Sequence, residues 1–403
     1  MENAPWRIIF LGAAASLILL FITYFLILPK TANFDQQKIE KILEFKNSYV
    51  SGRDNGKKVW EFYAKEGWSG KSGDVTYLKD VSKGRFYKNG DLIVKDLEAP
   101  LVKAWKKNKL IEAFGESNST NESRLKAVIA FTPRGRRKFA NLISDQITYN
   151  PDAKTSTVSG RISLKDNASS LFSNNMSIDH EKEISSLSNG VKYKRPDISI
   201  NCDTIDYFAK EEKMICRASI ETTVKSKPNA TSLKCDYMEV FIESNKDVIA
   251  LGSIEATQGK KIIFGNSLTY NKKFKYIIIK ENVKAIIEKA KVILKERTIN
   301  RLKSEEAKKI LHEKTVLTSN LLELSTENGN AKAIGNVFVL QKGKVAKADS
   351  AIYSEKDETI TLTRGVFLKK EKQWIKCQKI IVSVKNETFD AAGSVEAEFK
   401  IKK

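Results

Sequence analysis

Histidine is scarce in this chain: only His180 and His312 occur among its 403 residues. This scarcity excludes a histidine-rich metal site and leaves few side chains for a Ser–His–Asp or Cys–His catalytic arrangement. Neither histidine is followed by a second one four residues later, as the HExxH metalloprotease motif requires. A phosphate-binding loop is also missing, because Lys65 stands where the motif ending at Gly70-Lys71-Ser72 needs glycine. We therefore predict that the protein is not an enzyme and holds neither a metal nor another cofactor.

Long uncharged segments are equally rare. Only Ile8–Leu28 has membrane-spanning length, and Arg7 and Lys30 lie close to its ends. A transmembrane helix needs about 20 apolar residues. Since the rest of the chain has no other uncharged segment of that length, a polytopic transporter is excluded. We predict a short cytoplasmic tail over residues 1–7, a single anchor over 8–28, and a large domain on the other side of the membrane. The alternative is a cleaved signal peptide, whose apolar region is usually shorter.

Acidic residues are few relative to basic ones. The chain has 70 Lys and Arg against 49 Asp and Glu, for a net charge of +21. Nucleic-acid binding would concentrate these charges on one patch, whereas the lysines here are spread along the chain. We therefore expect no nucleic-acid partner. A solvated lysine-rich surface and attraction to anionic lipid head groups both remain compatible with the pattern.

Alternation of apolar and polar residues predicts β-strands along most of the chain. In Glu358–Leu368 four apolar residues share one face and Arg364 interrupts them, and Ser394–Ile401 alternates throughout. Near the start of the domain, Trp60 and Phe62 alternate with charged and polar neighbours. Half-buried strands of this kind predict an all-β fold with one face on a core.

A repeat of about 30 residues connects these strands. Each unit has a strand ending in an aromatic or aliphatic residue, followed about eleven residues later by a small or turn-forming residue. The small positions fall at residues 160, 190, 218, 252, 282, 335, 365 and 393. A unit of this length holds about two strands and cannot bury its own apolar face, so we expect the units to stack into one continuous core.

Three stretches interrupt the pattern. Residues 284–314 are ambiguous between a buried strand and a helical insertion, since SEEAKKIL at Ser304–Leu311 starts like a capped helix. Gly115–Ser123 and the Ser/Asn-rich Ala168–Gly190 are expected as loops, and the second could separate two domains.

Segment Ala348–Val395 resembles the OstA-type repeat of the lipopolysaccharide-export proteins LptA and LptC. The second half of that family's unit reads Gly-x-Val-x-Leu, and Gly335–Leu340 and Gly365–Leu368 are similar to it. After the predicted anchor, Gly56–Lys65 is similar to the opening strand of LptC. Gln146–Tyr149 and Ser159–Leu164 continue this likeness.

The resemblance covers roughly residues 8–165 as LptC-like and 195–403 as LptA-like. It implies an antiparallel β-jellyroll, one long or two tandem, with an apolar trough for lipid acyl chains. We place an LptC-like domain over 29–190 and an LptA-like domain over 191–403. The implied function is an inner-membrane-anchored, periplasmic component of lipopolysaccharide export; the alternative is a scaffold protein of the cell envelope. The implied partners are lipopolysaccharide, the membrane subunits of the export ABC transporter, and an LptA-like bridge or an LptD-like outer-membrane protein.

Site residues follow from the alternating faces. The residues expected to line the trough are Trp60, Phe62, Val337, Val339, Ile360, Leu362, Val366 and Leu368. The last strand would offer a free edge to a partner, with one face formed by Val395, Ala397, Phe399 and Ile401. Pairing of another chain with such an edge would extend the trough.

The four cysteines follow the repeat. Cys202, Cys235 and Cys377 each lie five residues before a strand end, and Cys202 and Cys216 are symmetric about a predicted hairpin. The periplasm permits disulfides. One bond, from Cys202 to Cys216 or Cys235, is therefore possible; the alternative is that these cysteines are small buried apolar residues.

Overall fold

The computed structural model describes residues 41–116, 124–130, 139–225, 230–242, 246–289, 299, 305–310, 312–384 and 386–399. The predicted tail and anchor lie outside these ranges. Within them, no helix is both long and apolar enough to cross a membrane.

The described chain is almost entirely β-strand, as predicted. The strands of the N-terminal half are β1 (Lys41–Asp54), β2 (Lys57–Gly70), β3 (Val75–Lys88), β4 (Asp91–Trp105), β5 (Ile111–Phe114), β6 (Leu125–Ala130), β7 (Phe139–Ser144), β8 (Gln146–Asn150), β9 (Thr155–Lys165), β10 (Ser170–Asp179), β11 (Ile184–Lys194) and β12 (Ile198–Phe208). Those of the C-terminal half are β13 (Lys213–Val224), β14 (Thr231–Phe241), β15 (Val248–Gln258), β16 (Lys261–Asn271), β17 (Tyr276–Ile287), β18 (Thr315–Ser325), β19 (Ala331–Gln341), β20 (Lys344–Ser354), β21 (Thr359–Lys370), β22 (Gln373–Ser383), β23 (Thr388–Ala392) and β24 (Glu396–Glu398). One short helix, α3 (Glu305–Ile310), lies between β17 and β18.

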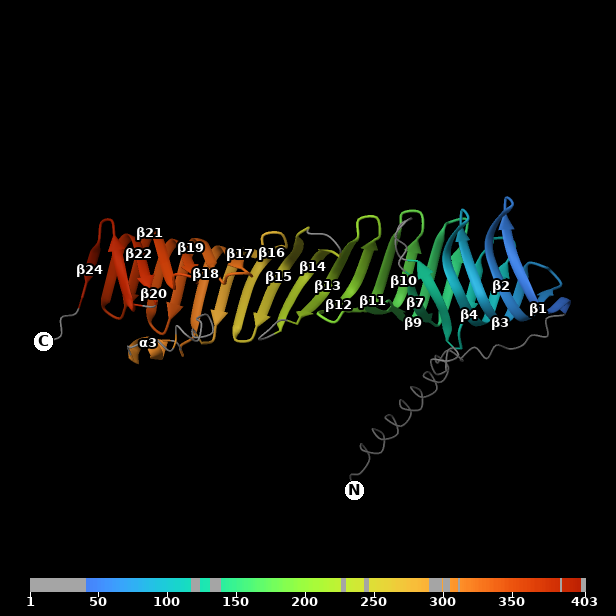
Figure 1. Ribbon diagram of the computed structural model, residues 1–403, viewed down its shortest axis with the longest axis horizontal. Coiled ribbons are helices and arrows are strands. Elements are labelled where there is room, and N and C mark those ends of the chain that lie inside the picture. Colours follow the sequence, from blue (N-terminus) through green and yellow to red (C-terminus); the bar gives the residue numbers. More distant parts are fainter. Residues whose placement is uncertain are drawn as a thin grey trace, which may run out of the picture.

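All described strands belong to one antiparallel sheet, in which strands consecutive along the chain mostly pair with each other. Near the N-terminal end, β4 pairs with both β5 and β6, and β9 pairs with both β7 and β8. The result is an elongated ladder of strands running from β1 at one end to β24 at the other (Figure 1). The described strands form one continuous sheet.

Most strands bend at mid-length, where the pairing register shifts. The bends coincide with the predicted small positions, all of which have positive φ, from Gly160 at 72° to Gly393 at 74°. Glycine adopts this conformation without the steric cost of a Cβ atom, which explains its recurrence. Two members of the series, Ala218 and Asn282, adopt it with side chains, at 59° and 54°. The predicted repeat is therefore confirmed.

The irregular stretches differ from the expectation. Ala168–Gly190 is not a loop: β10 and most of β11 lie within it and pair with each other. Its serines and asparagines mainly occupy the outer face, while Met176, Ile178 and Leu187 are buried. The boundary predicted at 190/191 falls inside β11. Of the ambiguous stretch, Lys284–Ile287 completes β17 and Glu305–Ile310 is helical, so each reading holds for a part.

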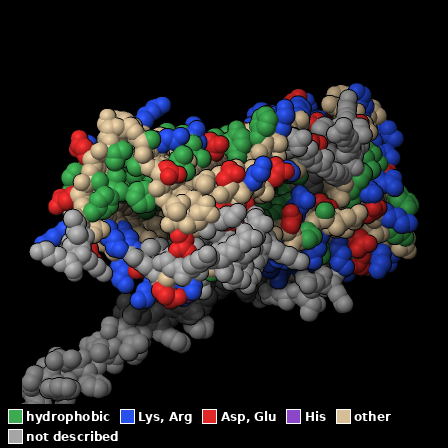
Figure 2. Space-filling model, turned by 60° about the vertical axis from the view of Figure 1, so that its left-hand side comes forward, with side chains coloured by type: hydrophobic (Ala, Val, Ile, Leu, Met, Phe, Trp, Pro, Cys, Tyr) green, Lys and Arg blue, Asp and Glu red, His purple; other side chains and the backbone are tan. Residues whose placement is uncertain are grey.

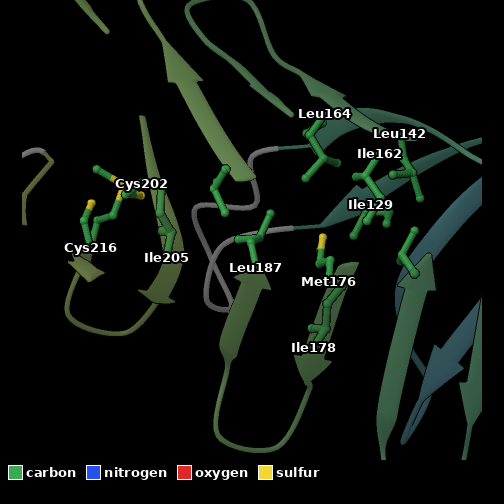
Figure 3. Close-up of a cluster of buried hydrophobic side chains, with 14 of the residues drawn as sticks. Ile129, Leu142, Ile162, Leu164, Met176, Ile178, Leu187, Cys202, Ile205 and Cys216 are labelled. Carbon is green, nitrogen blue, oxygen red and sulfur yellow. The ribbon is translucent and has the colours of Figure 1, made fainter. Parts of the chain in front are cut away.

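Buried side chains line the inner side of the bent sheet. One hydrophobic cluster extends from Phe62 to Val337, and a second from Ala348 to Ile380. Figure 3 shows part of the first cluster, where Met176, Leu187 and Ile162 from separate strands point toward one another. Ala351 packs against both clusters, so the apolar inner face continues from one to the other.

Candidate functional site

The inner face of β21 carries four of the predicted trough residues. Leu362 and Val366 are buried, and Ile360 and Leu368 are half-buried in the same cluster. They share a face although Arg364 lies between them, because Arg364 belongs to the bend with Gly365, where φ is 62° and 59°, and is exposed there. One repeat earlier, on β19, Val337 is buried and Val339 packs half-buried against the main cluster.

The two aromatic residues predicted for the trough lie in a different environment. Phe62 is 0% exposed, and Trp60 stacks on it with ring centroids 5.1 Å apart. Phe86 contacts Phe62 edge-on at 5.8 Å and stacks on Tyr149 at 5.0 Å. The Tyr149 hydroxyl donates a hydrogen bond to the Tyr87 carbonyl at 2.8 Å, joining strands that are not neighbours. This aromatic layer fills the interior near the N-terminal end.

The two halves of the molecule therefore differ in how completely their interior is filled. Among the described residues, the buried aromatic side chains Phe62, Phe86 and Tyr149 all lie in the N-terminal half, whereas the large buried side chains beyond Ile200 are aliphatic. From β12 onward, inner-face residues near the strand ends, such as Leu233, Ile263 and Leu317, are only half-buried. An apolar surface that is open to an occupant is thus concentrated in the C-terminal half.

A hollow of about 310 Å³ opens on this surface near the C-terminal end. Its lining includes the apolar side chains of Val339, Ala346, Leu368 and Ile375 together with the polar residues Gln341, Lys344 and Lys370. Phe399 also lines the hollow. The hollow is amphipathic, so it suits a ligand with both apolar and anionic parts.

The last two strands form an exposed edge with an apolar inner face. β23 and β24 both pair with β22, and Ala397 lies opposite the inward-facing Ile375. Val395 is 51% and Phe399 59% exposed; these residues and Ala397 belong to the predicted edge. Ile401, the fourth residue expected there, lies outside the described residues. Figure 2 shows hydrophobic side chains gathered at this end of the molecule.

The cysteines are free thiols, so the structure does not contain the possible disulfide among Cys202, Cys216 and Cys235. All four are buried on the inner face. Cys202 and Cys216 lie close together (Figure 3), and hydrogen bonding with Cys202 and burial raise the pKa of Cys216. Burial raises the pKa of Cys235 to about 12. The alternative prediction, that these cysteines are small buried apolar residues, fits the structure better.

A series of polar residues on the outside of the bends was not predicted from the sequence. It recurs with nearly the same period as the glycines and consists of Asp145, Asn174, Asp203, Asp236, Asn266, Asn320, Asp349 and Gln378. Several members lie against the glycine of the next strand: a Cβ atom on Gly252 would stand 2.4 Å from Asp236 Oδ2. Asp145 also accepts hydrogen bonds from Arg124 and Arg161, at 3.1 and 2.8 Å. The recurrence itself was readable from the sequence.

Side chains suited to metal binding or acid–base chemistry are sparse. Within the described residues, no three His, Cys, Asp or Glu side chains are grouped so that they could hold a metal ion. Ser156 Oγ and His180 Nε2 form a hydrogen bond of 2.7 Å, but both side chains are buried in the filled N-terminal interior.

Comparison with protein families gives one match. Residues 229–388 match the family described as the LptA/(LptD N-terminal domain) LPS transport protein. This range covers most of the half whose inner face is open. No curated protein matches the chain.

Proposed function

We propose that this protein binds lipopolysaccharide on its inner face and passes it along the ladder of strands toward the outer membrane. The observation that carries the proposal is the coincidence of two features. Residues 229–388 match a lipopolysaccharide-transport family, and the same residues form the half-filled part of a continuous apolar face.

The physical reason is the cost of exposing acyl chains to water. Each CH₂ group that leaves an apolar environment costs about 0.8 kcal/mol, and lipopolysaccharide carries many of them. An open β-sheet with an apolar inner face lowers this cost along its whole length without catalytic groups. The energy for directed transport would come from an ATPase elsewhere in the machinery.

The proposal includes an anchor in the inner membrane and a periplasmic domain. Its support is the uncharged run Ile8–Leu28 and the likeness of residues 56–65 to LptC. The protein should then remain in the membrane fraction after a high-salt wash. Replacing Ile18 and Leu19 by lysine should release it, because each charge near a helix centre disfavours insertion by about 2.5–3.5 kcal/mol. A wild-type protein recovered in the soluble fraction would argue against the anchor.

The C-terminal edge would receive the next component of the pathway. Val395, Ala397 and Phe399 continue the inner face to the last strand and are exposed. A bridge protein of the LptA type could add its first strand to this edge, extending both the sheet and the apolar surface.

Lipid recovered with the purified protein tests the function. The full-length protein, washed extensively in detergent, is extracted and the extract is analysed by mass spectrometry. Ala346→Trp should fill the hollow and lower the recovery of lipopolysaccharide, whereas Lys347→Trp on the outer face of the same strand should not. If both variants retain the wild-type amount, or if no lipid is recovered, a scaffold role without lipid transfer becomes the better explanation.

A further inference from the structure

The two rims of the open half differ in chemistry. The inward-facing residues at one set of strand ends are mostly polar or basic; we call Gln258, Lys261, Gln341, Lys344, Lys370 and Gln373 the polar rim. At the opposite strand ends the inward-facing residues are apolar or tyrosine; we call Tyr270, Ile277, Leu324, Tyr353, Ile360 and Val382 the apolar rim.

Strand register places the members of each set at the same strand ends, although Ile287 and Thr315 lie between Lys261 and Gln341 on the polar rim. On the polar rim, Lys261 lies opposite Gln258, and Gln341 opposite Lys344. Lys370 lies opposite both Lys344 on β20 and Gln373 on β22. On the apolar rim, Tyr270 lies opposite Ile277 and Tyr353 opposite Ile360. The rows are therefore properties of the sheet, not of single side chains.

The polar rim lies directly above an apolar wall. Two residues further into the sheet from Lys344, Lys370 and Gln373 are Ala346, Leu368 and Ile375, which line the hollow described above. Since side chains two residues apart share a face of a strand, each polar rim residue is followed inward by an apolar one. A ligand held here would meet donors at the rim and hydrocarbon below.

The polar rim brings two like charges into register. Lys344 and Lys370 are directly opposite each other, and like charges in this position destabilise a strand pair.

Two further features suit the rim to an anion. Lys261 is half-buried, and burial lowers its pKa; a bound anion would offset this effect by favouring the charged ammonium form. The amides of Gln258 and Gln341 donate hydrogen bonds to Thr231 and Thr315, at 3.1 and 3.0 Å. These bonds fix the amides beside the lysines and make the rim an ordered polar surface.

We propose that the polar rim binds the phosphate groups of an acylated, phosphorylated glycolipid, and that the apolar rim faces its acyl chains. This inference rests on the proposed function and adds to it the orientation of the lipid across the trough. Phosphates are attracted by several lysines at once, whereas the apolar rim presents no basic residue to them. The lipid would therefore move along the ladder without turning over.

Binding of two probes to the full-length protein tests this. The probes are bisphosphorylated lipid A and the same lipid A after enzymatic removal of both phosphates, measured by displacement of a fluorescent fatty acid. Lys344→Gln combined with Lys370→Gln should weaken binding of the phosphorylated probe by about tenfold, as expected for two lysines near anionic groups. Binding of the dephosphorylated probe should change little.

The matched control carries Lys347→Gln and Lys379→Gln, the same charge change at exposed positions of β20 and β22 that face outward. It should bind both probes as the wild type does. If the rim variant and the control lose affinity equally, or if the rim variant still prefers the phosphorylated probe as the wild type does, the rim assignment is wrong. If the wild type binds neither probe, the proposed function itself fails.

Discussion

Asn320 on β18 lies directly against Gly335 on β19, where both strands bend. A Cβ atom added to Gly335 would stand 2.6 Å from Asn320 Nδ2, and the glycine has a φ of 74°. The bend thus needs glycine for two reasons, its backbone conformation and the position of the neighbouring side chain. The same arrangement recurs at Asp236 with Gly252 and at Asp145 with Gly160.

Two alanine substitutions separate these reasons. Gly343 has a φ of 76° but nothing within 4 Å of an added Cβ atom, so Gly343→Ala should cost only the strain of a left-handed alanine, about 1 kcal/mol. Gly335→Ala should cost that strain plus about 1 kcal/mol or more for displacing Asn320. Urea unfolding of the two variants, compared with the wild type, measures the difference. Equal losses would show that the contact with Asn320 contributes nothing.

Acid should destabilise the N-terminal half through His180. Burial, and then the nearby charge of Lys88, lower the pKa of His180 from 6.5 to about 4. Between these values the unfolded chain binds a proton that the folded chain does not, so stability falls as pH decreases from 6.5 to 4. The full loss is about 3 kcal/mol.

Unfolding measured across this pH range tests the role of His180. His180→Gln should flatten the pH dependence, while the same change at His312, which is exposed, should leave it intact. An unchanged slope in the His180 variant would mean that other groups cause the acid sensitivity.

The cysteines should behave as protected thiols. Because Cys216 and Cys235 are buried and their pKa values are raised, few thiolates exist near neutral pH, and the thiolate is the reactive form. A thiol-specific reagent should label the native protein slowly and find four thiols after denaturation without reductant. A cysteine introduced at the exposed Lys347 should react at the normal rate. Two missing thiols in the denatured protein would instead demonstrate a disulfide.

The C-terminal edge allows a directional test of partner binding. The Gln378 N–H donates to the Gly393 carbonyl. Since the direction of backbone hydrogen bonds alternates from residue to residue along a strand, the backbone groups of Lys376 and Trp374 also point toward β24. Their opposites, Glu396 and Glu398, are therefore engaged within the sheet, and the Ala397 N–H points outward. Ala397→Pro should abolish binding of an LptA-type bridge protein while leaving β22 paired with β24.

Glu396→Pro is the companion variant, because it removes an internal donor and should loosen β24 itself. Binding of both variants is compared with that of the wild type by calorimetry. If Ala397→Pro binds the bridge protein with unchanged affinity, docking does not use this edge.

Much of the architecture could be predicted from the sequence because each repeat contains its own alternation of apolar and polar residues and its own small residue at the bend. Alternation identified the inner face of β21, and the small residues identified the bends. Arg364 departs from the alternation because it lies in the bend, while the residues on both sides of it keep the same face. The strands within 168–190 were missed because serine and asparagine on their outer face concealed three buried apolar positions.

The polar and apolar rims could not be predicted in the same way. A rim is a row across many strands, and its members are about 30 residues apart or separated by a turn. Gln341 and Lys344 join the row with Lys370 only once the register of β19, β20 and β21 is known. Local patterns give the face of a residue, whereas the row depends on pairing between strands.

Photo-crosslinking at one pair of neighbouring positions tests lipid transport along the inner face most directly. A benzophenone amino acid at Leu368, which faces the hollow, is compared with the same residue at Phe367, which faces outward and stacks on Trp374 at 6.4 Å. Irradiation of cells exporting lipopolysaccharide should give a lipopolysaccharide adduct at position 368 and none at 367. Equal labelling at both positions, or no adduct at 368, would contradict the trough.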